Sequence, residues 1–215
     1  MCGRYTVLTE EEIIRIREII KDISLRIVRD DIDNYEDTAV YGTAGEVFPT
    51  NHAPVITINS FERMKWGFKK WNSPGVIINA RSETIRTKSV FSKHLEYGRC
   101  VVPAGEFFEW EKLGTGKKKH YAKDKNGNLL FMAGLYRDIK DDNNPNETAR
   151  EFVIITKKSV GELAKIHDRM PVILRTEQIE AWLTREITPE DVVKMDYNVV
   201  VTPVEDYDTQ LSIFQ

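Results

Sequence analysis

The pair Asn126-Gly127 is the feature that most constrains the fold of this chain, because Asn-Gly is among the strongest short-range signals for a tight turn between two β-strands. Residues 121–125 precede the pair and residues 129–136 follow it, and both segments have the composition of strands. Asn and Gly tolerate the positive φ angles that a two-residue hairpin turn requires. We therefore predict a β-hairpin at this position, the clearest one in the sequence.

Several other strands are predicted, most of them short and apolar. They cover residues 54–59, 75–79, 99–103, 105–110, 151–156 and 198–202. The strands at 99–103 and 105–110 are expected to be joined by a turn, and the strand at 75–79 to be buried and to end on the polar residue Asn79. The run Lys117-Lys118-Lys119 is assigned to a solvated loop.

The longest helix is predicted over residues 10–24, where Thr9-Glu10-Glu11-Glu12 forms a capping box. Its apolar stripe consists of Ile13, Ile16, Ile20 and Ile23. Shorter helices are predicted over residues 89–95 and 159–165, and two more begin at Thr176 and at Thr188-Pro189. Residues 29–37 and 140–150 are polar and are assigned to loops, the second as the most mobile tip of the chain.

Composition places the chain among globular proteins. Its 215 residues are 41% hydrophobic and 30% charged, which favours one domain over residues 1–215 with a sizeable core. The net charge of −3 and a pI near 5.9 exclude a protein that coats nucleic acid through bulk positive charge. Any polyanionic partner must therefore be held by a local basic patch.

Cysteine usage and hydropathy indicate the compartment of the protein, and two cysteines suit a reducing one. The two cysteines are Cys2 and Cys100, and the second is expected to be a buried strand thiol. The sequence has no apolar run long enough to span a bilayer, and residues 1–12 lack the pattern of a signal peptide. We therefore expect a soluble cytoplasmic protein.

Cys2 is the first candidate for chemistry, since removal of Met1 would make it the N-terminal residue. It would then be a 1,2-aminothiol, with an amine of reference pKa about 7.7–8.0 and a thiol of about 8.5. An aldehyde can form an imine with the amine, after which the tethered thiol closes a five-membered thiazolidine ring. Lysine and internal cysteine do not offer this pair of nucleophiles.

Aromatic and basic side chains alternate over residues 63–71, which include Trp66 and Phe68. Such a composition is found in grooves that stack the bases of single-stranded nucleic acid and hold its phosphates. It is equally common in a half-buried strand, because tryptophan side chains usually pack. Both interpretations stay open from this stretch alone.

Three further polar residues stand at positions suited to a site. Asn79 follows an apolar strand, and an amide there either points into a cleft or caps the next turn. Glu109 alternates with Phe108 and Trp110, so it acts in proton transfer if its face lines a pocket and is a plain surface acid otherwise. His167 beside Asp168 is a weak signal by itself.

Five separated motifs occur in one order along the chain. They are Met1-Cys2-Gly3-Arg4, Trp66-Gly67, Asn79-Ala80-Arg81-Ser82-Glu83, 102–105 leading to Phe108-Glu109-Trp110, and His167-Asp168-Arg169-Met170-Pro171. Together they closely resemble the SOS response-associated peptidase (SRAP) family. The resemblance implies an α/β fold of the α+β type, a single domain with a β-rich, barrel-like core flanked by short helices. It also implies covalent capture of abasic sites in single-stranded DNA as a thiazolidine.

Roles follow from the same resemblance. Cys2 would be the cross-linking nucleophile, Asn79 would bind near the reacting centre, Glu109 would shuttle protons and His167 would assist opening of the abasic sugar. The residues expected to contact DNA are Arg4, Trp66, Phe68, Arg81 and Arg169. No cofactor or metal is implied, and we expect a monomer that is nucleoid-associated when bound to DNA. The chain departs from the family pattern at Lys157-Lys158 and over residues 202–206.

Two other functions compete with this one. A cysteine peptidase or amidase would use Cys2 to attack a carbonyl carbon, with His167 as its base. A non-catalytic module would bind single-stranded DNA through Trp66, Phe68 and nearby lysines, and its binding would survive Cys2→Ala. The family name also implies autoproteolytic removal of Met1, although methionine aminopeptidase accepts a small second residue as well.

Overall fold

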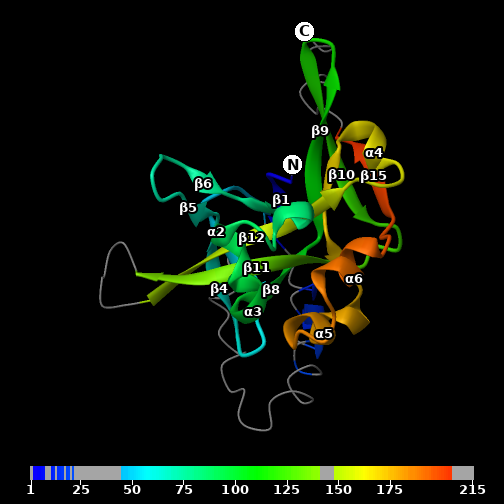
Figure 1. Ribbon diagram of the computed structural model, residues 1–215. Helices are drawn as coiled ribbons and strands as arrows, with labels where there is room; N and C mark the ends of the chain where they lie inside the picture. The colour runs from blue at the N-terminus through cyan, green and yellow to red at the C-terminus, as the bar shows by residue number, and fades with distance from the viewer. Residues whose placement is uncertain are drawn as a thin grey trace.

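The computed structural model describes residues 2–7, 11, 12, 14–16, 18, 19, 21, 45–140 and 148–204. Strands are the main regular structure in this part of the chain, and they form two large antiparallel-dominated sheets and one small hairpin (Figure 1). The helices are short and lie at the periphery of the sheets. The prediction of a β-rich, barrel-like core flanked by short helices is confirmed.

The first sheet has five strands in the order β15-β10-β9-β1-β2. Their bounds are Val199–Pro203, Gly116–Asp124, Glu106–Leu113, Tyr5–Val7 and Gly45–Val47. The short strand β1 pairs with β2 on one side and meets β9 at Tyr5 and Phe107 on the other. This pairing fixes the N-terminal segment against the middle of the sheet.

The second sheet has the order β13-β12-β4-β3-β8-β11-β14, and β7 pairs in parallel with β12 beside it. These strands are Arg169–Pro171, Thr148–Lys158, Phe61–Trp66, His52–Ile56, Arg99–Ala104, Leu130–Lys140, Ile173–Leu174 and, for β7, Asn79–Arg81. A separate hairpin is formed by β5 (Phe68–Lys69) and β6 (Val76–Ile77). Asn79 therefore begins a strand, whereas the sequence predicted that it ends one.

The predicted hairpin around Asn126-Gly127 is wrong, although the turn itself exists. Gly127 has a φ of 75°, and the Asp124 carboxylate accepts hydrogen bonds from the backbone N–H groups of Asn126 (2.8 Å) and Asn128 (3.1 Å). The strands on either side, β10 and β11, join different sheets: β10 pairs with β9 and β15, and β11 pairs with β8, β12 and β14. The turn thus passes the chain from one sheet to the other, because a turn signal does not specify the partner of a strand.

Two other predictions about strands need the same correction. The strands β8 and β9 are separated by Gly105 alone, yet they lie in different sheets and form no hairpin with each other. The run Lys117-Lys118-Lys119 belongs to β10, so its assignment to a loop is wrong. It is β9 and β10 that form a long antiparallel hairpin, in which Leu113 pairs with Gly116 at the tip.

The helices agree better with the sequence. The described residues among 11–21 are helical, and Ile16 is fully buried, whereas Ile13, Ile20 and Ile23 lie outside the described residues. The remaining helices are α2 (Ser89–Ser92), α3 (His94–Tyr97), α4 (Leu163–Ile166), η4 (Thr176–Gln178), α5 (Ile179–Leu183) and α6 (Pro189–Lys194), with a 3-10 turn η3 at Ser82–Thr84. Thr188 caps α6 as predicted, and α4 is shorter than predicted. The predicted loop at 29–37 and most of that at 140–150 lie outside the described residues.

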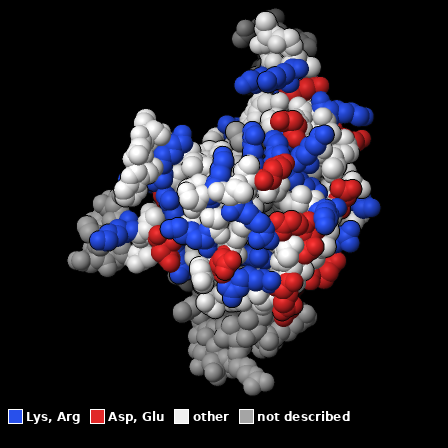
Figure 2. All heavy atoms as spheres, viewed as in Figure 1, with Lys and Arg blue, Asp and Glu red and all other residues white. Residues whose placement is uncertain are grey.

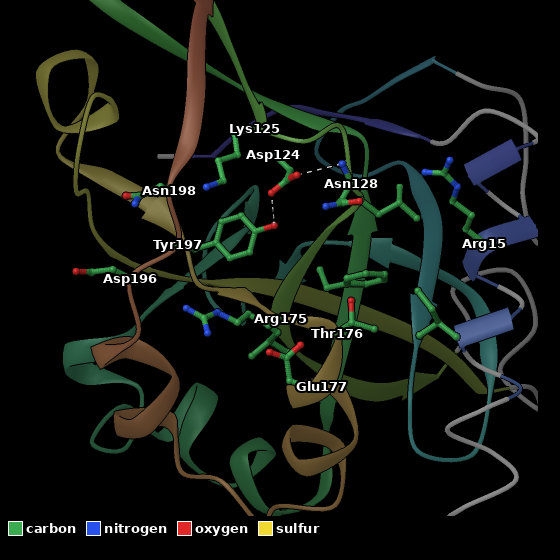
Figure 3. A pocket seen from close by; sticks show the side chains of 14 residues that line it. Arg15, Asp124, Lys125, Asn128, Arg175, Thr176, Glu177, Asp196, Tyr197 and Asn198 are labelled. Atoms are coloured by element: carbon green, nitrogen blue, oxygen red, sulfur yellow. Dashed lines mark hydrogen bonds between the residues drawn. The ribbon is translucent and has the colours of Figure 1, made fainter.

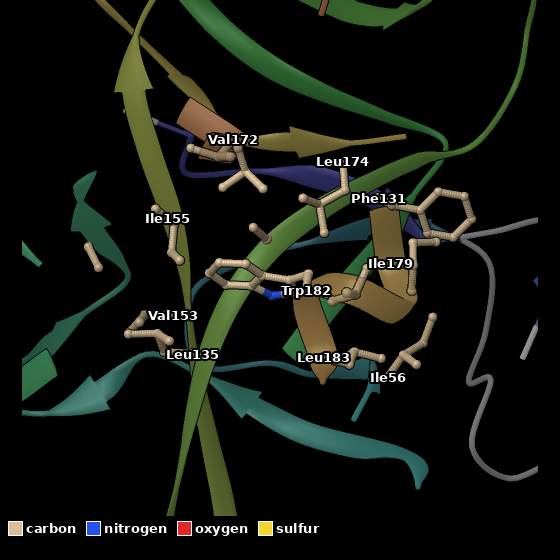
Figure 4. Packing of buried hydrophobic residues seen from close by; sticks show 14 of the residues in the cluster. Ile56, Phe131, Leu135, Val153, Ile155, Val172, Leu174, Ile179, Trp182 and Leu183 are labelled. Carbon is tan, nitrogen blue, oxygen red and sulfur yellow. The ribbon is translucent and has the colours of Figure 1, made fainter. Parts of the chain in front are cut away.

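Two groups of buried apolar residues make up the core. In one, the helix α5 places Ile179, Trp182 and Leu183 against the second sheet (Figure 4). The Trp182 indole N–H donates a hydrogen bond of 3.0 Å to the carbonyl oxygen of Cys100. The other group lies between the two sheets and includes Cys2 together with residues of both. The site described next is therefore built into the core.

Candidate active site

Cys2 lies just before β1 and is fully buried. The Asn79 side-chain amide donates a hydrogen bond of 2.8 Å to the Cys2 carbonyl oxygen, and the Cys2 thiol is 3.9 Å from the carbonyl oxygen of Arg4. The Arg4 carbonyl also accepts a hydrogen bond of 2.9 Å from the Phe108 backbone N–H. The N-terminal segment is thus held on one side by β7 and on the other by β9.

Glu109 and His167 face each other next to this segment. Glu109 is in the middle of β9 and is only 2% exposed. His167 directly follows α4, and its Nε2 atom is 3.9 Å from a carboxylate oxygen of Glu109. The His167 Nδ1 atom lies 3.0 Å from the backbone N–H of Arg169 and 3.2 Å from both the Arg169 carbonyl oxygen and the Asp168 carboxylate. These contacts fix the ring so that its Nε2 atom faces the Glu109 carboxylate.

The electrostatics of these groups suit proton transfer near neutral pH. Burial raises the pKa of Glu109 to about 7, against the opposing effect of the positive chain terminus. Burial lowers the pKa of His167. Burial, and then the negative charge of Glu109, raise the pKa of the Cys2 thiol well above its usual range. The thiol consequently stays protonated until a base removes its proton.

The structure brings all four predicted catalytic residues together from four separate segments. Contacts link Asn79 to Cys2, the charge of Glu109 acts on Cys2, and Glu109 faces His167. The Asn79 Oδ1 atom is buried and has no hydrogen-bond partner among the described residues. An acceptor is thus available next to Cys2 for a bound molecule.

For Trp66 and Phe68, the structure favours the half-buried strand over the nucleic-acid groove, the two interpretations that the stretch left open. Both side chains are fully buried. The Trp66 indole donates a hydrogen bond of 3.0 Å to the Ile78 carbonyl oxygen and stacks on Phe152 with a centroid distance of 6.3 Å. Gly67 between them has a φ of 116°, which breaks the alternation of the strand, and the two rings enter different core groups: Trp66 lies in the group with Cys2 and Phe68 in the group with Trp182. Their predicted contact with DNA is therefore wrong.

Arg169 is likewise a structural residue. Its guanidinium group makes two hydrogen bonds to the carboxylate of Glu83, of 2.5 and 2.9 Å, and one of 2.6 Å to the Thr156 carbonyl oxygen. Its side chain is mostly buried. The predicted DNA contact is corrected to a role in fixing β13, and with it His167, against η3.

Arg4 and Arg81 remain at the surface. Arg81 ends β7 and is exposed. Arg4 forms an ion pair of 2.9 Å with Glu46, and its guanidinium group lies over the Phe48 ring at 4.3 Å and over the Trp110 ring at 5.1 Å. Figure 2 shows basic side chains gathered across the middle of the face that carries β1 and β9. Arg81 is therefore open to solvent, whereas Arg4 is half-buried and paired with Glu46.

The sequence did not single out two residues that the structure brings forward. Trp71, at the tip of the β5–β6 hairpin, is 96% exposed and follows Lys69 and Lys70. It lies within the aromatic and basic stretch, but the stretch did not reveal which ring is exposed. His120 is buried and lies opposite Glu109 in the β9–β10 ladder, with its Nε2 atom 3.5 Å from a carboxylate oxygen of Glu111.

Two cavities lie outside this group of residues. The first, of about 470 Å³, lies between the end of β10, η4 and residues 196–198, and the Tyr197 hydroxyl there donates a hydrogen bond of 2.8 Å to Asp124 (Figure 3). The second, of about 510 Å³, is lined by Glu83, Lys157, Lys158 and residues of α6. The Lys157 ammonium group donates to the carbonyl oxygens of Met195 (2.6 Å) and Val193 (3.1 Å), so this departure from the family pattern stabilises the end of α6.

In the part of the chain that the structure describes, no three His, Cys, Asp or Glu side chains are grouped as a metal site requires. Nor does any described helix have the length and apolar character needed to cross a membrane.

Comparison with known proteins identifies relatives of this chain. Residues 1–210 match the family model described as SOS response associated peptidase (SRAP). The chain is 33% identical over 207 residues to the abasic site processing protein YoqW of Bacillus subtilis (strain 168), covering 90% of this chain and 85% of that protein. It is 32% identical over 128 residues to the abasic site processing protein YedK of Escherichia coli (strain K12), covering 59% and 56% of the two chains. A solved structure from Bacteroides thetaiotaomicron has the same fold, with a TM-score of 0.74 at 21% identity over 97% of this chain and 94% of the other.

Proposed function

Since the chain belongs to the SOS response associated peptidase (SRAP) family, we propose that it captures abasic sites in single-stranded DNA as a covalent adduct on Cys2. Its relatives YoqW and YedK are named abasic site processing proteins, which supports this substrate. The observation that carries the proposal is the position of Cys2, which lies beside Glu109 and is held by Asn79. Removal of Met1 is part of the proposal, because it frees the amine of Cys2.

The reaction joins two nucleophiles to one carbon. The amine of Cys2 adds to the aldehyde carbon of the ring-opened abasic sugar, and loss of one water molecule gives an imine. The thiol then adds to the same carbon: the sulfur–carbon bond forms, the C=N π electrons move to nitrogen, and the thiol proton is transferred to that nitrogen. The product is a thiazolidine. Trapping of the imine in this ring suppresses the strand cleavage by β-elimination that an imine alone promotes.

Each of the three remaining residues has one task in this scheme. Glu109, with its raised pKa of about 7, takes the thiol proton and returns it to the nitrogen. The Nε2 atom of His167, which faces Glu109, donates a proton to the sugar ring oxygen and so assists opening to the aldehyde. The Asn79 amide holds the Cys2 backbone, and its Oδ1 atom accepts a hydrogen bond from the substrate.

Binding of the strand rests on surface residues around this site. Arg4 and Arg81 contact phosphates, and exposed Trp71 stacks on a base next to Lys69 and Lys70. We assign to Trp71 the stacking on a base that the sequence predicted for Trp66 and Phe68. The phosphate contacts carry no information about the missing base, so they serve intact and abasic strands alike.

Three proteins test the mechanism: the native protein, Cys2→Ser, and a form with an uncleaved N-terminal extension. Each is incubated with abasic single-stranded DNA and analysed by denaturing gel and intact mass. The native protein is expected to start at Cys2 and to give a stable adduct. Cys2→Ser keeps the amine but closes the ring poorly, so it should give strand cleavage or a labile adduct. The extended form should give neither.

An extended form that cross-links as well as the native protein would show that the aminothiol mechanism is wrong. In a cysteine peptidase or amidase the thiol alone suffices, so the extended form would stay active on an amide substrate. A binding module would retain its affinity in Cys2→Ala and give no adduct with any of the proteins.

The intact mass of the Glu109→Gln variant tests how Met1 is removed. Retention of Met1 in this variant indicates autoproteolysis, and its loss indicates an external aminopeptidase.

A further inference from the structure

The outer face of the β9–β10 hairpin carries a regular array of basic and aromatic side chains. In the ladder, Lys112 pairs with Lys117, Trp110 with Lys119, Phe108 with Tyr121, and Glu106 with Lys123. Directly opposite residues of an antiparallel pair lie on the same face, and so do alternate residues of one strand. All eight side chains therefore share one face of the sheet. The neighbouring Arg4 and Phe48 extend this array toward β2.

The cations of this face are held over aromatic rings. The Lys119 ammonium group is 3.9 Å from the centre of the Phe108 ring, and that of Lys123 is 5.4 Å from the centre of the Tyr121 ring. The Glu46 carboxylate pairs with both Lys119 (2.5 Å) and Arg4 (2.9 Å). Such contacts restrict the head groups before any partner arrives, which reduces the ordering that binding requires.

The charge of the face differs in sign from that of the whole chain. The array contains the five cations Arg4, Lys112, Lys117, Lys119 and Lys123 and only the two carboxylates Glu46 and Glu106, whereas the chain has a net charge of −3. Local positive charge with aromatic rings between the cations is the composition that holds the backbone of a nucleic acid strand. Charge complementarity thus selects a polyanion as the partner.

The face adjoins the candidate active site. Arg4 is two residues from Cys2, and its carbonyl oxygen accepts a hydrogen bond from the Phe108 backbone. Glu109 points to the opposite side of β9 from Phe108 and Trp110. The strand β1 meets β9 only near Phe107 and Phe108, so within the described chain residues 109–113 of β9 have no strand on that side. The outer face and the site are thus separated only by β9 itself, on whose opposite sides Phe108 and Glu109 lie.

We propose that the outer face of the β9–β10 hairpin binds the phosphates of the single strand that flanks the abasic nucleotide on one side. This inference rests on the proposed function and extends it, because it assigns a second contact region that Arg4 connects to Cys2. It also gives a role to Lys117-Lys118-Lys119, of which Lys117 and Lys119 lie on this face and Lys118 on the other.

The test compares strands of two lengths. Intact oligothymidylates of about 5 and about 20 nucleotides, spanning the usual footprint of such sites, are titrated at several salt concentrations by fluorescence anisotropy. The variant is Lys117→Gln/Lys123→Gln, since both side chains are exposed. The matched control is Lys88→Gln/Lys93→Gln, which removes two exposed lysines near α2, away from this face.

For the long strand, the slope of log K against log salt should fall by about 1.4 in the variant, because two phosphate contacts are lost at about 0.7 each. When the salt concentration rises from about 50 to about 200 mM, the ratio of the native to the variant binding constant for the long strand should therefore fall about sevenfold. The short strand and the control should show no such change in slope. Equal changes for both lengths, or for variant and control, would overturn the proposal.

Failure of this proposal and failure of the proposed function give different results. If native protein forms no adduct with an abasic strand but the variant still loses its preference for long strands, the face binds DNA and the covalent chemistry is wrong. If the adduct forms normally and the salt slopes of variant and native protein agree, the chemistry stands and the face is not a DNA contact. Thermal melts of the native protein, the variant and the control confirm that each of the three is folded.

Discussion

At the scale of single residues, the raised pKa of Glu109 links catalysis to stability. Its folded pKa of about 7 lies above the ordinary carboxyl value of about 4.5, so the folded state binds the proton more tightly than the unfolded state does. The contribution of protonated Glu109 to the free energy of unfolding is therefore fully present below about pH 4.5. It is lost as the pH rises toward 7, by about 3 kcal/mol in all. A group that is well suited to proton transfer here opposes folding at neutral pH.

Glu109→Gln should consequently be more stable than the native protein at pH 8 and similar at pH 4.5. The same variant should form the adduct about 10²–10⁴-fold more slowly, and the increase in rate with pH around 7 should disappear. Thermal melts at the two pH values and a pH–rate profile measure both effects. Unchanged rates at every pH would assign Glu109 to structure alone.

Arg169 tests the correction made to its role. Because its guanidinium group is bound to Glu83 and to the Thr156 carbonyl, Arg169→Gln should lower the melting temperature and loosen the backbone that positions His167. We expect slower adduct formation with little change in affinity for an intact strand. A large loss of affinity at an unchanged melting temperature would instead restore the direct DNA contact.

The motifs selected the four residues that the structure brings together, but they did not reveal the surroundings of the site. Cys2, Asn79, Glu109 and His167 could be selected from sequence because each belongs to a recognisable motif. The burial of Trp66, Phe68 and Arg169 could not, because it depends on strands that pair far along the chain and on the backbone angle at Gly67. Composition alone does not distinguish a ring that stacks on a base from one that stacks on Phe152.

At the scale of elements, Trp66 at the end of β4 and Trp71 at the tip of the β5–β6 hairpin have opposite exposure: the first is fully buried and the second is 96% exposed. Trp71→Ala should weaken binding of single-stranded DNA by about 1–3 kcal/mol and leave the melting temperature unchanged, because the ring is exposed. Trp66→Ala should destabilise the fold by about 3–5 kcal/mol, because it removes a fully buried ring. Binding titrations and denaturant unfolding of both variants check this contrast, and the reverse pattern would contradict it.

Local signals predicted the positions of strands better than their partners. Most strands occur near their predicted residues, and Thr188 starts α6 as its capping pattern indicated. The pairing of β10 with β9, and of β11 with β12, was missed because the strongest turn signal lies between β10 and β11. The Asp124 side chain satisfies the backbone of that turn without any strand pairing, so the same residues serve a connection between sheets.

At the scale of the whole molecule, net charge and local charge act in opposite directions. The chain carries a net charge of −3, which repels DNA at long range, while Arg4 and Arg81 lie at the surface beside the site. Salt screens the long-range repulsion and also competes with the phosphate contacts. For a strand bound through several contacts, the release of counterions is the larger effect, so affinity should fall as salt rises.

Arg81→Glu tests this balance, because it reverses one charge without touching a buried contact. Binding should weaken for intact and abasic strands alike, since a phosphate contact does not report the missing base. The slope of log K against log salt should fall by about 0.7 for the lost contact. Arg86→Glu is the matched control, because Arg86 is exposed near the same 3-10 turn and pairs with Glu190. This substitution is expected to lower the melting temperature slightly and to leave the salt slope unchanged. A native affinity that is flat between low and moderate salt would show that no basic patch holds the strand, and the site would then have to recognise its substrate through the abasic sugar alone.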